Sequence, residues 1–202
     1  MKRAASIEGL LLWLAACGGG GGGGDDGAAD PRLARLDAYE AQELRVLGDP
    51  EAGVPGLPMT AEGNLPDSGA LSFAGFASLR VEIGTTPLVL FGDANLTVDF
   101  DGATAAGAVN NVFGNSNAQT VADFDGVLSI QGTVMGQNMP LTYQGTLTAP
   151  GQTLGFDGSL NGLFLGNPVA AFSAADLEAD VDQNGTTRDA TIVITLEETL
   201  MP

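Results

Sequence analysis

Apolar and polar residues alternate with a period of two along most of the chain after Ser68. Successive side chains of a β-strand point to opposite faces, so this alternation predicts strands with one buried and one solvated face. Leu96 and Val98, for example, alternate with Thr97 and Asp99. The segments that carry the pattern are Leu79–Ile83, Leu96–Phe100, Leu128–Val134, Leu141–Leu147, Leu154–Leu160, Leu177–Val181 and Ile192–Leu196.

Short turn signals separate these segments. Connections of this length join antiparallel neighbours, because a parallel crossover needs a dozen or more residues. Eight to ten such strands without a long helix among them predict an all-β sandwich or barrel. The turn signals are Asp101-Gly102, Asp125-Gly126, Gly136-Gln137-Asn138, Pro150-Gly151, Asn167-Pro168 and Asn184-Gly185.

Four glycines favour the barrel over the sandwich. Gly107, Gly132, Gly145 and Gly158 occupy the parity that otherwise carries apolar side chains. A missing side chain lets a strand bend or relieves crowding inside a small barrel. The same glycines would also suit an open ligand cavity, so the sequence leaves a filled and an open interior as alternatives. The predicted fold class is an all-β, antiparallel, up-and-down β-barrel of about eight strands.

A short amphipathic helix is predicted before the barrel, at about residues 31–47. Asp30-Pro31 is typical of a helix start, and Leu33, Leu36, Leu44 and Leu47 fall near one face before Gly48. We expect this face to pack across an end of the barrel domain rather than to bind a partner helix. Residues 48–68, rich in proline and glycine, are expected to form an irregular connection.

The first residues have the pattern of a bacterial export signal. Lys2 and Arg3 precede the apolar stretch Leu10–Leu14, and Leu14-Ala15-Ala16 places small residues just before Cys17. Leu-Ala-Ala-Cys resembles the lipobox of bacterial lipoproteins, whose cysteine is acylated and becomes the first residue after cleavage. The apolar stretch is too short for a membrane-spanning helix. Lipidation at Cys17 is therefore expected, and several acyl chains would anchor the protein stably.

Residues 18–29 have the composition of a flexible tether, with seven consecutive glycines from Gly18 to Gly24. A chain of this kind and length spans roughly 20 Å. Gly18 after the cysteine resembles an outer-membrane sorting signal. The expected organisation is a signal peptide at 1–16, the lipidated cysteine and tether at 17–29, a helix and irregular connection at 30–67, and a β-barrel domain at 68–202.

Composition argues against nucleic acid as a partner and against the usual catalytic centres. The formal net charge is −18, and phosphate binding needs clustered Lys or Arg. The chain has no histidine and a single cysteine, so the common nucleophile–base pairs and zinc ligand sets are absent. An enzyme would depend on carboxylates such as Asp99 with Asp101, or Asp123 with Asp125. Solvated acids on one strand face explain both pairs more simply. We expect no cofactor and no enzymatic activity.

Asp180, Asp182 and Asn184, followed by Gly185, match the first half of a calcium-binding loop. Position twelve of such a loop would be Thr191 instead of the closing glutamate, and the flanks have strand patterns. A hairpin turn at Asn184-Gly185 explains the same residues. Calcium binding is thus retained only as the minor alternative.

Three stretches resemble the β-barrel domain of transferrin-binding protein B-like surface lipoproteins, which are related in architecture to factor H-binding protein. They are residues 95–107 (NLTVDFDGATAAG), the two segments 142–147 (TYQGTL) and 156–160 (FDGSL), and residues 162–171 (GLFLGNPVAA). The resemblance implies an eight-stranded antiparallel barrel, outer-membrane anchoring and display outside the cell. It does not carry transferrin binding to this chain, because the named protein has two lobes and this chain has room for one.

The sequence therefore favours a lipid-anchored, non-enzymatic binding module for a protein or small solute, located in the outer membrane at the cell surface. The alternatives are a location on the periplasmic face and a structural or assembly role in the envelope without a soluble ligand. Its partners would be the lipid bilayer, through acylated Cys17, and a protein or small-molecule ligand of unspecified identity.

Overall fold

The computed structural model describes residues 30–117 and 120–199. Helix α1 (Pro31–Val46) comes first, followed by the two-residue strands β1 (Gly48–Asp49) and β2 (Val54–Pro55) and the 3₁₀ helix η2 (Glu62–Asn64). Eight long strands follow: β3 (Ala70–Val81), β4 (Leu88–Asp99), β5 (Thr104–Asn117), β6 (Thr120–Thr133), β7 (Asn138–Ala149), β8 (Gln152–Leu165), β9 (Ala171–Gln183) and β10 (Thr186–Glu198).

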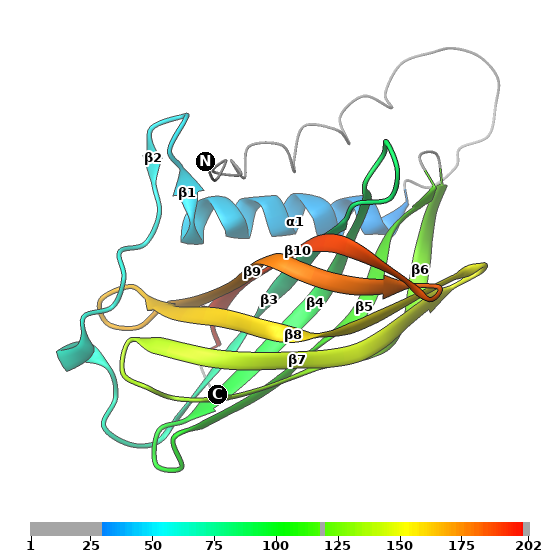
Figure 1. Cartoon of the computed structure of the whole chain (residues 1–202). Helices are drawn as coiled ribbons and strands as arrows, with labels where there is room; N and C mark the ends of the chain where they lie inside the picture. Colours follow the sequence, from blue (N-terminus) through cyan, green and yellow to red (C-terminus); the bar gives the residue numbers. More distant parts are fainter. Residues whose placement is uncertain (1–29, 118–119, 200–202) are drawn as a thin grey trace, which may run out of the picture. The chain divides into compact units, whose positions relative to one another are not determined.

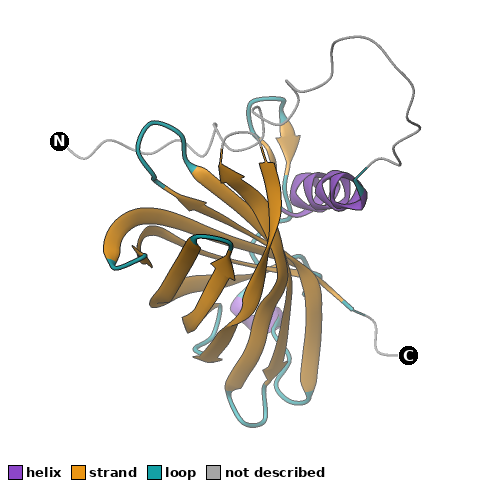
Figure 2. Ribbon diagram, turned by 90° about the vertical axis from the view of Figure 1, so that its right-hand side faces the viewer, coloured by secondary structure: helices purple, strands orange, loops and turns teal. Residues whose placement is uncertain are grey.

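The eight long strands form a closed barrel in the order β10-β3-β4-β5-β6-β7-β8-β9 (Figures 1 and 2). Every neighbouring pair is antiparallel, and β10 closes the barrel against β3, with Ala190 opposite Val81 and Glu198 opposite Phe73. Closure removes the exposed edges that an open sheet would present. The predicted up-and-down barrel of about eight strands is confirmed.

Apolar side chains fill the interior of the barrel. Phe73, Phe164 and Phe172 pack against one another, with ring centroids 5.4–6.4 Å apart. A Cβ at Gly107 would clash with the carbonyl oxygen of Asn95, and one at Gly158 would clash with the hydroxyl group of Tyr143. The inward glycines therefore relieve crowding, and of the two sequence interpretations the filled interior holds.

One strand departs from the predicted alternation. In β9, Ala179 lies opposite Ala190, but the next inward pair is Asp176 with Ile192, so two residues of β9 face only Thr191. This bulge shifts the phase of the strand. The prediction that Leu177 shares the buried face of Ala179 is wrong: Leu177 is 50% exposed, and Asp176 takes the inward position.

Helix α1 begins at Pro31 and ends at Val46, one residue earlier than predicted. It lies along the side of the barrel instead of across an end (Figure 2). Its buried residues are Tyr39, Gln42 and Val46, whereas Leu33 and Leu44 are half exposed, so the predicted buried face was partly wrong. The reason is an aromatic patch on the outer wall of the barrel, where the ring of Tyr39 stacks on Phe76 with centroids 4.7 Å apart.

The segment after α1 runs to the barrel end where β8 finishes (Figure 1). The backbone N–H of Thr60 donates to the Phe164 carbonyl at 2.9 Å, and its hydroxyl donates to the Gly166 carbonyl at 2.7 Å. Leu65 packs against the barrel core. Among the described residues, no helix has the length and apolarity needed to cross a membrane.

Candidate functional site

The outer surface of the barrel has two parts. We call the outer faces of β3, β4, β5 and the second half of β10, which α1 packs against, the covered wall. We call the outer faces of β7, of β8 and β9 away from the barrel end where β8 finishes, and of the first half of β10 the open wall. At that end Val46 and Leu57 pack on Leu165 and Ala171. Strand β6 lies between the two walls. Because a solvated strand face is free to carry polar groups, the open wall is where a site can form without disturbing the core.

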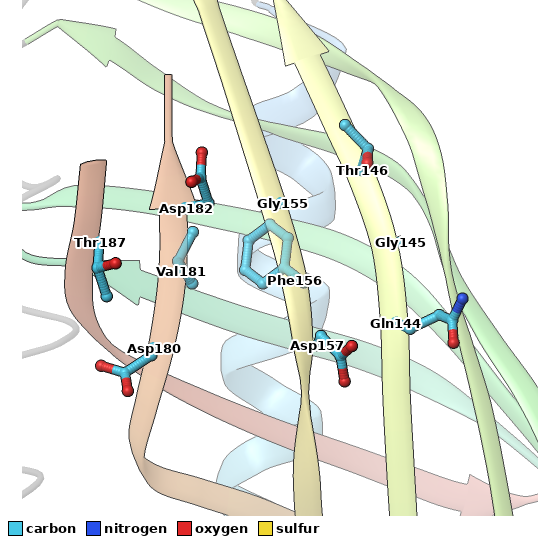
Figure 3. A pocket seen from close by; sticks show the side chains of 10 residues that line it. All are labelled: Gln144, Gly145, Thr146, Gly155, Phe156, Asp157, Asp180, Val181, Asp182 and Thr187. Carbon is cyan, nitrogen blue, oxygen red and sulfur yellow. The ribbon is translucent and has the colours of Figure 1, made fainter. Parts of the chain in front are cut away.

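The open wall holds a shallow, open groove of about 420 Å³. The hollow exists because Gly155 faces outward without a side chain: a Cβ there would lie 3.6 Å from Cβ of Asp182, with no closer neighbour. Figure 3 shows the lining side chains. They come from β7 (Gln144, Gly145, Thr146), β8 (Gly155, Phe156, Asp157), β9 (Asp180, Val181, Asp182) and β10 (Thr187).

The groove is negatively charged. Asp157, Asp180 and Asp182 are exposed along it, and no basic residue is among those that line it. Within the described residues, every arginine already has an acidic or amide partner elsewhere. These pairs are Arg32–Asp123, Arg35–Asp93, Arg45–Glu197, Arg80–Glu82 and Arg188–Gln183.

Beside the groove, the ladder between β8 and β9 is interrupted. Phe156 pairs with Val181, but the next pair is Asn161 with Ala175. We call the interrupted stretch, residues 157–160 of β8 and 176–180 of β9, the β8–β9 break. β8 remains paired with β7 throughout this stretch, so the break opens only toward β9.

Tyr143 spans the inner side of the break. Its hydroxyl donates a hydrogen bond of 2.9 Å to Oδ2 of Asp176, over the space left by Gly158. Burial raises the pKa of Tyr143, as do the hydrogen bond to Asp176 and the nearby charges of Asp157 and Asp180. The hydroxyl therefore remains a donor at neutral pH, and it gives the inward carboxylate of Asp176 a partner where backbone pairing fails.

The three residues weighed as calcium ligands divide between a strand and a turn. Asp180 and Asp182 lie on the outer face of β9, whereas Asn184 and Gly185, with φ of 51° and 84°, form the β9–β10 turn. Asn184 Oδ1 accepts from the Thr153 N–H at 2.9 Å, and Asp182 Oδ1 accepts from the Gly185 N–H at 2.7 Å. Residues 30–117 and 120–199 contain no acidic, His or Cys cluster that would hold a metal ion. The hairpin turn accounts for the motif.

Three of the four carboxylates considered for catalysis, those of Asp99, Asp101 and Asp123, have structural partners. Asp99 Oδ1 accepts from the N–H groups of Asp101 and Gly102 at 3.0 and 3.1 Å, and Asp101 Oδ2 accepts from the Gly69 N–H at 3.0 Å. These bonds fasten the β4–β5 turn. Asp123 pairs with Arg32 of α1 at 3.2 Å and so helps to hold the helix. Cys17, the predicted lipidation site, lies outside the described residues, and its lipidation stays a prediction.

A second polar cluster fastens α1 to the covered wall. Arg35 donates to Tyr39, to Asp93 and to the Asn111 carbonyl at 2.9–3.0 Å, and its guanidinium lies 4.5 Å from the ring centre of Phe113. Burial opposes ionisation of Asp93, but hydrogen bonds from Tyr39, Asn111 and Arg35 outweigh it and lower the pKa of Asp93. Burial and the Asp93 hydrogen bond raise the pKa of Tyr39 to about 12.

Sequence reasoning missed Asp157 and the Tyr143–Asp176 pair. The alternation does place Asp157 on the outward parity of its strand, but its meeting with Asp180 and Asp182 depends on the pairing register of β8 with β9, and the inward position of Asp176 depends on the β9 bulge. Neither is readable from periodicity alone.

No protein-family model matches the chain, and no curated protein matches it significantly. Among solved structures, the chain is similar to two mutant forms of the vaccine antigen Transferrin Binding Protein B from Haemophilus parasuis Hp5. Their TM-scores are both 0.50, with 13% and 15% sequence identity over 71% of this chain. The match spans only 28% and 29% of those longer chains. The resemblance expected from the sequence is thereby confirmed at the level of the fold, a transferrin-binding protein B-like barrel.

Proposed function

We propose that this protein is an outer-membrane lipoprotein that serves as a non-enzymatic binding module at the cell surface. In this proposal residues 1–16 are removed on export, Cys17 is acylated, and residues 17–29 tether the folded part to the bilayer. The observation that carries the binding role is the groove on the open wall. It is a hollow on the outside of a closed barrel whose interior is filled.

Three features support a binding role over catalysis. The groove offers carboxylates and hydroxyl groups held by rigid strands, whereas outside it Asp99 and Asp101 hold a turn and Asp123 holds the helix. The filled core argues against a ligand inside the barrel. The structural neighbours are named as transferrin-binding proteins, and we take from that name only the class of ligand, a protein.

Membrane fractionation and protease accessibility on intact cells test the proposal. The full chain should fractionate with the outer membrane, and the Cys17→Ala variant should be released from it. External protease should digest the folded part on intact cells. Protection until the outer membrane is broken would contradict surface display and favour a periplasmic structural or assembly role. Unchanged membrane association of the Cys17→Ala variant would contradict the lipid anchor.

A further inference from the structure

We propose that the groove and the adjoining β8–β9 break bind a basic, extended segment of a partner protein, with lysine or arginine at alternate positions. This inference rests on the proposed binding function and specifies the chemistry of the ligand. It joins three observations about the open wall: its charge pattern, its interrupted backbone ladder and its exposed apolar side chain.

The charge pattern has the spacing of an extended chain. Asp180 and Asp182 are two residues apart on the same face of β9, which separates them by about 7 Å. Cationic side chains at positions i and i+2 of an extended peptide have the same spacing. Asp157 of the neighbouring strand β8 lines the same groove (Figure 3). Charge-assisted hydrogen bonds to carboxylates are the strong ones in protein recognition.

The β8–β9 break favours a peptide over a small cation. Regular strand pairing stops between Phe156–Val181 and Asn161–Ala175, which leaves backbone groups of both strands outside the ladder. Among them, the Glu178 N–H donates to Asp176 Oδ1 at 3.2 Å. A peptide backbone both donates and accepts hydrogen bonds, as in strand addition. A polyamine only donates, so it has no use for exposed N–H groups. Leu177, 50% exposed at the bulge, adds an apolar contact that a peptide side chain would bury.

A second copy of this chain does not fit the groove. The chain has a formal charge of −18, so two copies repel each other. Each arginine of the described residues is also engaged with an acidic or amide side chain of its own fold. The complementary charge must come from another protein.

The test measures fluorescence anisotropy of a labelled peptide that alternates arginine and serine, with the purified full chain lacking only its signal. A peptide that alternates glutamate and serine is the charge control, and spermidine is the small-cation control. The double variant Asp157→Asn/Asp180→Asn should weaken binding of the arginine peptide at least tenfold. The matched double variant Asp37→Asn/Asp125→Asn, which removes two exposed carboxylates outside the groove, should change it less than twofold.

A steric variant provides an independent arm. The space beside Gly155 accepts a Cβ, so Gly155→Val should fold normally and fill the groove. It should weaken peptide binding at least tenfold while the net charge stays the same, and circular dichroism should match the parent protein.

Equal losses of peptide affinity in the two double variants would overturn the proposal, because they would show that the peptide is attracted by the net negative charge of the protein and not by the groove. Binding of spermidine as tight as that of the peptide would overturn the choice of a peptide. A partner captured on cells, together with no peptide binding in vitro, would refute this inference and leave the proposed function standing. Failure of the proposed function itself would appear as protease protection on intact cells.

Discussion

The covered wall and the open wall are built from the same kind of strand but differ in what their outward positions carry. On the covered wall these positions hold Phe76, Phe91 and Phe113, which form a second small core with Tyr39 of α1. On the open wall the equivalent positions hold Gln144, Thr146, Asp157, Asp180 and Asp182. The first set is buried beneath a helix, whereas the second faces solvent.

This difference separates two tasks within one barrel. Burial of aromatic side chains stabilises the covered wall, so a change there should lower the free energy of unfolding. The open wall contributes carboxylates of like charge, of which Asp182 accepts a hydrogen bond from the Gly185 N–H of its own turn. Substitutions on the open wall should therefore change binding much more than stability.

The largest effect is expected from Phe113→Ala on the covered wall. Phe113 is 1% exposed and lies under the guanidinium of Arg35. Its truncation should lower the free energy of unfolding by about 3–5 kcal/mol through lost burial and a residual cavity. Val127→Ala, at a 49% exposed outward position of β6, is the control and should cost less than about 0.5 kcal/mol. Chemical denaturation compares the two; equal losses would contradict the division into walls.

Glycine substitutions sharpen the same contrast. A Cβ at Gly75 would clash with the Thr195 carbonyl and lie 2.6 Å from Nε2 of Gln42 on α1, so strand and helix would both have to shift. We expect Gly75→Ala to cost about 1–3 kcal/mol. Gly155→Ala on the open wall has room for the methyl group and should be neutral or slightly stabilising. Thermal unfolding measures the stability of both variants. A larger loss of stability for Gly155→Ala than for Gly75→Ala would contradict the contrast between the covered and the open wall.

Asp93→Asn should have a smaller effect that depends on pH. At pH 7 the variant loses charged hydrogen bonds to Arg35, and because Asp93 is partly exposed we expect a loss of about 1 kcal/mol. The pKa of Asp93 in the folded protein is lowered, so its stabilisation is present above the ordinary value of 3.8 and is lost as pH falls through the folded pKa.

Urea unfolding at pH 7 and pH 3 checks this expectation. The gap between wild type and Asp93→Asn should be smaller at pH 3 than at pH 7. Asp125→Asn, an exposed carboxylate without such partners, serves as the control and should show little difference at either pH. A gap that widens on acidification would contradict the role given to Asp93.

The smallest effect on stability belongs to the groove acids. Asp157→Asn/Asp180→Asn removes two like charges on neighbouring strands and should raise stability by a few tenths of a kcal/mol in dilute buffer. Salt screens exposed charges, so the gain should vanish near 1 M NaCl. A loss of more than about 1 kcal/mol in the free energy of unfolding, measured by thermal unfolding, would mean that these carboxylates stabilise the barrel, and it would contradict a role of the open wall in binding alone.

Much of the barrel could be predicted from the sequence because its signals are local. Period-two alternation and the Asp101-Gly102 and Asn184-Gly185 turns act over a few residues, and the inward glycines could be found by parity. The turn predicted at Asp125-Gly126 is wrong, because both residues lie inside β6 and pair with β7. The face of α1 was misjudged because Leu33 and Leu44 look like a core stripe until the aromatic patch that receives Tyr39 is known. That patch is assembled from three strands.

The groove needed information that periodicity does not contain. Asp157 and Asp180 are neighbours only through the register of β8 against β9, and the β9 bulge moves Asp176 inward and Leu177 outward. A bulge adds one residue without a reliable composition signal, and one residue changes the face of everything beyond it. The sequence therefore identified the acids Asp180 and Asp182 and the hairpin turn beside them, but not that Asp157 of β8 lies in the same groove.

Site-specific photo-cross-linking on intact cells tests most directly the claim that the open wall is the binding face. A photoreactive residue would replace Thr187, which lines the groove, and in a matched strain Ala38, which is exposed on α1. We predict a discrete adduct with a partner protein at Thr187 and none at Ala38. Adducts of equal yield at both positions, or an adduct only at Ala38, would contradict it.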